Sequence, residues 1–129
     1  MSTTLLILLV GLFVCHYLAD FTHLSMNFML EAKRTGKPLL PIFIHALVHA
    51  DLMFFFLLFM TPDTEIITTL FLIELFSHFI IDTLKGRMNV WFKKVASPSN
   101  KIHWVVFGAD QLLHSLIIVL MVYLFFVMQ

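Results

Sequence analysis

The sequence predicts an all-α integral membrane protein with four transmembrane helices and two short interfacial helices on the cytoplasmic side. Its 129 residues are 60% hydrophobic and only 12% charged. The mean hydropathy of +0.97 is far above that of a soluble domain. The chain contains four apolar runs, each close to the roughly 20 residues that cross a bilayer as a helix. A chain of this length is expected to form one domain, residues 1–129.

The first apolar run, residues 3–21, is short for a transmembrane helix but adequate if its ends lie in the interface. The residues before it lack the basic region and small-residue cleavage site of a signal peptide, so we expect this run to stay in the mature protein. The other spans are expected at residues 39–60, 66–84 and 102–128. Pro62 ends the second span, and Trp104 and Tyr123 mark the inner and outer ends of the fourth.

Two segments between the spans predict interfacial helices. The first, residues 22–38, ends at Gly36 and Pro38. Its apolar side chains are expected on the membrane surface, namely Leu24, Phe28 and Met29. Its charged side chains are expected in water, namely Glu31, Lys33 and Arg34. The second, residues 88–95, has apolar residues at amphipathic-helix spacing, namely Met88, Trp91, Phe92 and Val95.

The basic residues predict the orientation in the membrane. All eight Lys and Arg fall within residues 33–37 and 85–101, whereas the connection at 61–65 carries two acids and no base. The positive-inside rule therefore predicts that both basic segments are cytoplasmic and that both termini lie outside. The expected location is the inner (cytoplasmic) membrane, which the chain crosses several times.

Each predicted span contains one pair of polar residues four positions apart. Residues at this spacing share a helix face, and an ionisable side chain in mid-membrane costs roughly 2.5–3.5 kcal/mol, so such groups need partners or a function. The predicted orientation places all four pairs in the cytoplasmic half, within a slab about 10 Å thick. Two successive hairpins carry similar pairs, which suggests a parallel repeat. The pairs are His16 and Asp20, His45 and His49, His78 and Asp82, and Asp110 and His114.

Imidazole and carboxylate ligands without thiolate favour zinc, iron or manganese, so these eight residues predict a divalent transition-metal site. They exceed the ligands of one tetrahedral zinc, which leaves open a two-ion site or one ion with neighbours that orient its ligands. Glu74, Gln111 and His23 are accessory candidates, and His103 is expected at the interface. The alternative is that the polar pairs only bond helix to helix.

The same ordered motifs resemble a known family of small bacterial and phage integral membrane proteins, catalogued as domain of unknown function number three thousand three hundred and seven. The likeness covers nearly the whole chain. The resemblance implies a shared site but no particular activity, because the family has no established activity. One position departs from the family pattern, since Leu24 stands where a Gln usually follows the first Asp by four residues.

Three functions fit these observations. The first is a metal-dependent membrane hydrolase acting at the cytoplasmic leaflet, with its catalytic residues unassigned. The second is a metal-ion or proton transporter or channel, although the outer halves of the spans offer almost no polar residue for a path. The third is a structural or effector subunit without bound metal. Besides the lipid bilayer, the expected partner is a second copy in a homodimer, which Asp51 would face, and no nucleic acid is expected.

Overall fold

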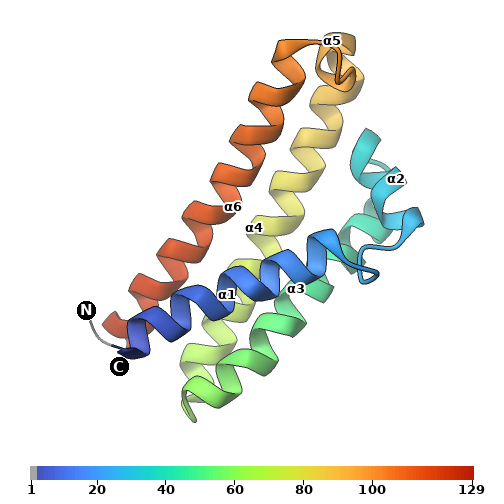
Figure 1. Ribbon diagram of the computed structural model, residues 1–129. Helices are drawn as coiled ribbons and strands as arrows, with labels where there is room; N and C mark the ends of the chain where they lie inside the picture. The colour runs from blue at the N-terminus through green and yellow to red at the C-terminus, as the bar shows by residue number, and fades with distance from the viewer. Residues whose placement is uncertain (1–2) are drawn as a thin grey trace.

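The computed structural model describes residues 3–129, and these form an all-helical fold without β-strands (Figure 1). The expectations about the first two residues, including the position of the extreme N-terminus, lie outside the described residues. The helices in chain order are α1 (Thr3–Phe21), α2 (Asn27–Thr35), α3 (Leu39–Met60), α4 (Thr64–Trp91), α5 (Lys93–Ala96) and α6 (Lys101–Val127).

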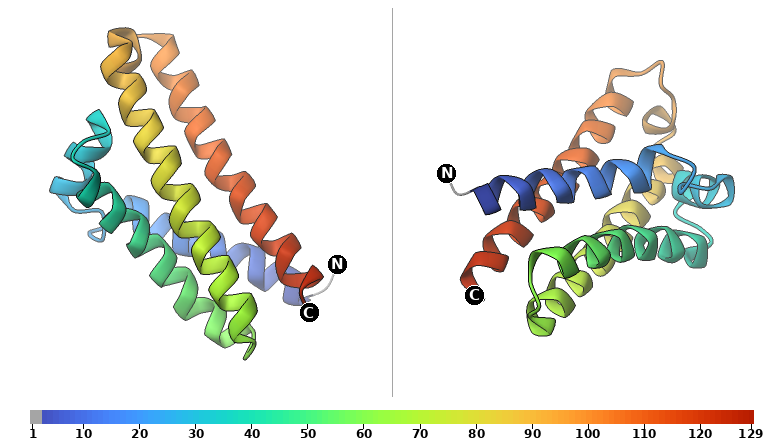
Figure 2. Two further views of the ribbon diagram at one scale, coloured as in Figure 1. Left: turned by 180° about the vertical axis from the view of Figure 1, so that it is seen from behind. Right: turned by 60° about the horizontal axis from the view of Figure 1, so that its bottom comes forward.

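Four of these helices, α1, α3, α4 and α6, are long and apolar enough to cross a membrane. Each contacts two others, so that α1, α3, α4 and α6 form a closed ring. The antiparallel helices α4 and α6 lie alongside each other, and α1 crosses them (Figures 1 and 2). The helices predicted at residues 3–21 and 39–60 are confirmed as helices, and the fourth is shifted by one residue at each end.

The predicted third span ends too early. It was expected at residues 66–84, but α4 begins at Thr64 and continues without a break to Trp91. The separate interfacial helix expected at residues 88–95 is therefore wrong, since only Lys93–Ala96 forms a helix of its own. Lys85 and Arg87 end the apolar run without ending the backbone hydrogen bonding, because a helix can continue beyond the hydrophobic stretch that it contains.

Local signals set the helix ends that position the site. The Asp63 carboxylate accepts hydrogen bonds from the backbone N–H groups of Glu65 at 2.9 Å and Ile66 at 3.2 Å, which caps α4. At the end of α2, Gly36 adopts a left-handed conformation with a φ of 69°, and its N–H donates to the Ala32 carbonyl at 2.8 Å. The chain can therefore turn sharply from α2 into α3.

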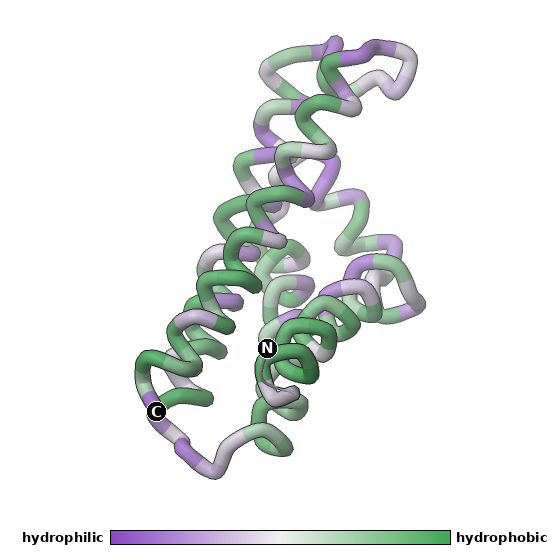
Figure 3. Tube along the Cα trace, turned by 60° about the vertical axis from the view of Figure 1, so that its left-hand side comes forward, coloured by the Kyte–Doolittle hydropathy of each residue, from purple (hydrophilic) through white to green (hydrophobic). Residues whose placement is uncertain are grey.

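The outer surface of the ring is apolar. Large hydrophobic side chains point outward from all four long helices; Phe59, for example, is 89% exposed. In Figure 3 hydrophobic residues run along these helices, and hydrophilic ones gather at α2 and at the connections between helices. A continuous apolar exterior of this kind is typical of helices that face lipid.

The interior is divided along the helix axes. Toward the α3–α4 turn, apolar side chains from all four long helices fill the core, including Leu12, Met53, Leu70 and Met121. The polar pairs lie beyond this core, nearer to α2 and α5. The part of the bundle that contains the polar residues is therefore held in place by a packed apolar half.

The short helix α2 packs on α4 and α3, and it is therefore more buried than the predicted surface helix. Met29 and Ala32 are buried against protein, and a Cβ added to Gly86 of α4 would overlap the backbone N of Gly36 and lie 2.5 Å from the Lys33 carbonyl oxygen. The absence of a side chain at Gly86 thus allows α2 to approach α4 closely.

Replacing Gly86 with Ala should push α2 away from α4, because the obstructing atoms belong to the backbone and cannot rotate aside. We expect a loss of about 1–3 kcal/mol in the free energy of unfolding, the usual cost of overpacking. Thermal unfolding in detergent measures this effect. Gly108→Ala is the matched control, since a Cβ there meets nothing within 4 Å. Equal unfolding temperatures for the two variants would contradict the close packing of α2 on α4.

Candidate metal centre

Residues of the predicted polar pairs converge inside the bundle, with one pair from each long helix. The side chains of His16 and Asp20 are 9% and 7% exposed, and those of the other members are more deeply buried. Glu74, predicted as an accessory group, lies fully inside the cluster at 2% exposure. The buried members are His16, Asp20, His45, His49, Glu74, His78, Asp82, Asp110 and His114.

Five imidazole rings form the centre of this cluster, and His78 of α4 lies in the middle. Its ring centroid is 3.6 Å from that of His49 and 4.1 Å from that of His114. The rings of His45 and His16 follow at 5.3 and 5.7 Å. Side chains from α1, α3, α4 and α6 thus meet at a single ring, which a spacing of four residues on each helix makes possible.

The closely packed rings of His49 and His78 separate the cluster into two sides. On one side the Nδ1 atoms of His78 and His49 lie 3.1 and 3.8 Å from Glu74 Oε1. On the other side, His49 Nε2 is 3.4 Å from Asp20 Oδ1, and His78 Nε2 is 3.4 Å from Asp82 Oδ2. We call these the glutamate side and the aspartate side. Each of the two rings offers a nitrogen to both.

Three sets of potential ligand atoms lie within 4.8 Å of one another. Ligand atoms bound to one ion at about 2.0–2.2 Å lie at most about 4.4 Å apart, so these sets need only a small contraction to bind an ion. His78 belongs to all three, and it can serve two ions because it has two ring nitrogens. The sets are His16, His49, Glu74 and His78; Asp20, His45, His49 and His78; and His78, Asp82 and His114.

Several buried ring nitrogens of the cluster have no hydrogen-bond partner among the described residues. Neither nitrogen of His49 forms a hydrogen bond, and the Nε2 atoms of His78 and His114 also form none. An unsatisfied buried polar group costs about 1–3 kcal/mol, so such groups are rare. Their concentration around a common point favours a ligand at this position, and imidazole nitrogens without protons are suited to metal ions.

Lys33 is a member of the cluster that the sequence analysis placed in water. Its ammonium Nζ lies 2.9 Å from Asp20 Oδ1, 3.0 Å from Asp82 Oδ2 and 2.9 Å from His45 Nε2. Burial favours the neutral amine, but the carboxylates of Asp82 and Asp20 raise the pKa of Lys33 above its usual value. Its spacing from Met29 was an available signal, because residues four apart share a helix face and Met29 is buried.

Asp110 lies at the edge of the cluster and belongs to none of the three sets. Its Oδ2 accepts hydrogen bonds from Lys85 Nζ at 2.9 Å and from Gln111 Nε2 at 3.1 Å. Its Oδ1 is 3.7 Å from His114 Nε2. The structure therefore favours Asp110 as a group that orients His114, and Gln111 as its hydrogen-bonding neighbour.

Two histidines lie outside the cluster. The accessory candidate His23 is exposed in the turn after α1 and belongs to no ligand set. His103, expected at the interface, is near the start of α6, and its Nδ1 donates to the Val95 carbonyl at 2.7 Å. The single Cys15 is buried, and its Sγ contacts the Leu52 carbonyl oxygen at 3.7 Å.

The position of Lys33 predicts competition between its ammonium and a metal ion on the aspartate side. Two cations cannot occupy the same space between Asp20 and Asp82, so Lys33→Met should raise the affinity for a divalent ion about 10–100-fold, given the strength of such repulsion in a protein interior. Metal titration of the purified protein measures this, and Lys37→Met, which removes an exposed lysine, is the control. Equal affinities in the two variants would contradict the competition.

Comparison with known proteins places the chain in a family. No curated protein and no solved structure matches it. A family profile described as "Protein of unknown function (DUF3307)" matches residues 8–129. This match covers all four long helices except the first residues of α1, and therefore every member of the cluster. The chain belongs to the DUF3307 family.

Proposed function

We propose that this is an integral membrane protein whose buried histidine and carboxylate cluster binds one or two divalent transition-metal ions. The ring nitrogens of His49, His78 and His114 that form no hydrogen bond with the described residues are the observation that carries the proposal. Five imidazoles and several carboxylates without thiolate suit zinc, iron or manganese. The two-sided geometry around His49 and His78 supports two ions as readily as one.

The proposed orientation places α2, α5 and the metal centre toward the cytoplasm and both termini outside. It rests on the positive-inside rule. One contact supports it, because Asn89 Nδ2 donates to the Arg34 carbonyl at 3.1 Å and so joins the two basic segments at one end of the bundle. The acidic α3–α4 turn is at the opposite end, beyond the apolar core.

For the reaction we propose metal-dependent hydrolysis of a substrate that arrives from the cytoplasmic leaflet. A bound zinc ion, for example, would lower the pKa of a coordinated water to about 7 and so would supply a hydroxide nucleophile. The apolar core favours this function over transport, because side chains such as Leu8, Leu57 and Phe125 fill the bundle between the cluster and the α3–α4 end. An ion path through these residues would lack polar groups.

The homodimer remains part of the proposal. Asp51 is exposed on the outside of α3, in the middle of a helix long enough to span a membrane. A carboxylate facing lipid at that depth is costly, so a neighbouring protein surface would provide a better environment. This favours a second copy packed against α3.

Elemental analysis of the purified protein tests the metal centre. We expect at least about one equivalent of zinc, iron or manganese per chain, which His49→Ala and His78→Ala should each greatly reduce because these rings supply ligands to the glutamate and aspartate sides. His23→Ala is the control, because His23 is exposed and outside the cluster. Less than one equivalent, unchanged by His78→Ala, would refute the centre.

Cysteine labelling tests the orientation. In a Cys15→Ser background, Lys93→Cys should react with a membrane-impermeant maleimide only after the cells are opened, because α5 is cytoplasmic in the proposal. Asp63→Cys, in the exposed α3–α4 turn, should react on intact cells. The reverse pattern would invert the orientation and place the metal centre near the outer leaflet.

A further inference from the structure

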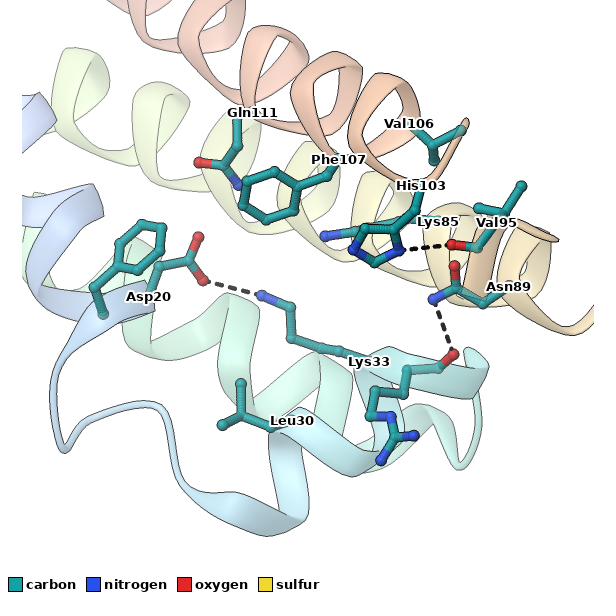
Figure 4. A pocket seen from close by; sticks show the side chains of 12 residues that line it. Asp20, Leu30, Lys33, Lys85, Asn89, Val95, His103, Val106, Phe107 and Gln111 are labelled. Carbon is teal, nitrogen blue, oxygen red and sulfur yellow. Dashed lines mark hydrogen bonds and ion pairs between the residues drawn. The ribbon is translucent and has the colours of Figure 1, made fainter. Parts of the chain in front are cut away.

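A cavity of about 380 Å³ lies beside the metal centre, between the end of α1, α2, the last turns of α4, α5 and the first turns of α6. Asp20 and Lys33, which are joined by an ion pair in Figure 4, belong both to its wall and to the aspartate side of the cluster, so the cavity adjoins the centre. Its volume falls within the range typical of small-molecule binding sites, about 300–1,000 Å³.

The charged side chains of the cavity wall are mainly cationic. Lys33, Arg34 and Lys85 line it, against one carboxylate, Asp20. Lys33 and Lys85 are paired with aspartates at 2.9 Å. Arg34 is exposed and forms no ion pair with a described residue, so its guanidinium is free to bind an anion through two parallel hydrogen bonds.

The rest of the wall is apolar. Leu30 from α2 lies across the cavity from Phe107 of α6 (Figure 4), and Val106 of α6 and Phe21 of α1 also line it. A free phosphate ion would leave this surface in contact with water, whereas a hydrocarbon chain would cover it and so contribute hydrophobic binding free energy. The combination of a cation and an apolar wall therefore fits an anionic amphiphile.

A second, wider groove of about 960 Å³ continues from the cavity and shares Arg34, Asn89 and His103 with it. Arg34 thus stands at the junction between the apolar cavity and an open groove that also includes Lys37. This groove provides room for a head group at the basic end of the bundle, where anionic lipids accumulate in the proposed orientation.

We propose that the cavity binds an anionic phospholipid, with the phosphate at Arg34 and the hydrocarbon chain along Leu30, Val106 and Phe107. Such a lipid would be the substrate of the proposed hydrolase, and this role rests on the proposed function. Binding of the lipid does not, because it requires the cavity and Arg34 and no metal ion.

Native mass spectrometry of the protein in a neutral detergent tests this binding. Phosphatidic acid should bind one molecule per chain at least about 10-fold more tightly than phosphatidylcholine with the same acyl chains, since its phosphate carries a net negative charge that the choline of phosphatidylcholine cancels. Inorganic phosphate at equal concentration should not displace it, because phosphate lacks the chain. Displacement by inorganic phosphate, or equal binding of the two lipids, would overturn the proposal.

Variants locate the site. Arg34→Gln should remove most of the preference for phosphatidic acid, whereas Lys101→Gln, an exposed cation that lines neither hollow, should leave it intact. Val106→Trp should reduce binding of both lipids by filling the cavity. An Arg34→Gln variant with the original preference would refute the assignment, as would equal losses in both Gln variants.

Metal content, measured in the same samples, separates the two proposals. Arg34→Gln should keep the metal of the unmodified protein, because Arg34 contributes to none of the ligand sets. Lipid preference in a protein without metal would sustain the lipid site and refute the metal centre. Metal in a protein without lipid preference would refute the lipid site alone.

Discussion

The neutralisation of Asp20 and Asp82 by Lys33 is the interaction on which the rest of the arrangement depends. Two carboxylates inside an apolar bundle each lose several kcal/mol of hydration, and an ammonium within 3.0 Å of both offsets this loss. The contact joins α1, α2 and α4. It also requires α2 to lie close to α4, which Gly86 permits. The short segment that connects two of the long helices therefore becomes part of the interior.

The histidines depend on a second constraint, the division of the bundle into an apolar and a polar half. Leu, Ile, Met and Phe side chains pack the end near the α3–α4 turn and set the separations of the four helices. Within that frame His49 and His78 lie with ring centroids 3.6 Å apart and direct nitrogens to two sides. Without the apolar half, the polar side chains would move apart and become hydrated. The packed apolar half keeps them together.

Much of this site could be predicted from spacing, because residues four apart share a face of a helix whatever the tertiary structure. Glu74, His78 and Asp82 form one stripe on α4, and the structure directs that stripe inward. The prediction of helix ends failed where contacts with neighbouring helices determine them. Hydropathy ended the third span at residue 84, but the helix continues, and Lys85, which ends the apolar run, is paired with Asp110 of α6 at 2.9 Å.

The sequence by itself determined that the chain has four long apolar helices, that each contains a pair of ionisable residues on one face, and that the basic residues flank only two of the connections. Period and composition are local properties, and they need no partner to be recognised. Only the tertiary structure decided that Glu74 is central and Asp110 peripheral, that His49 and His78 divide the cluster, and that Lys33 enters it. These are distances between side chains on different helices, and they follow from how α1, α2, α3, α4 and α6 pack.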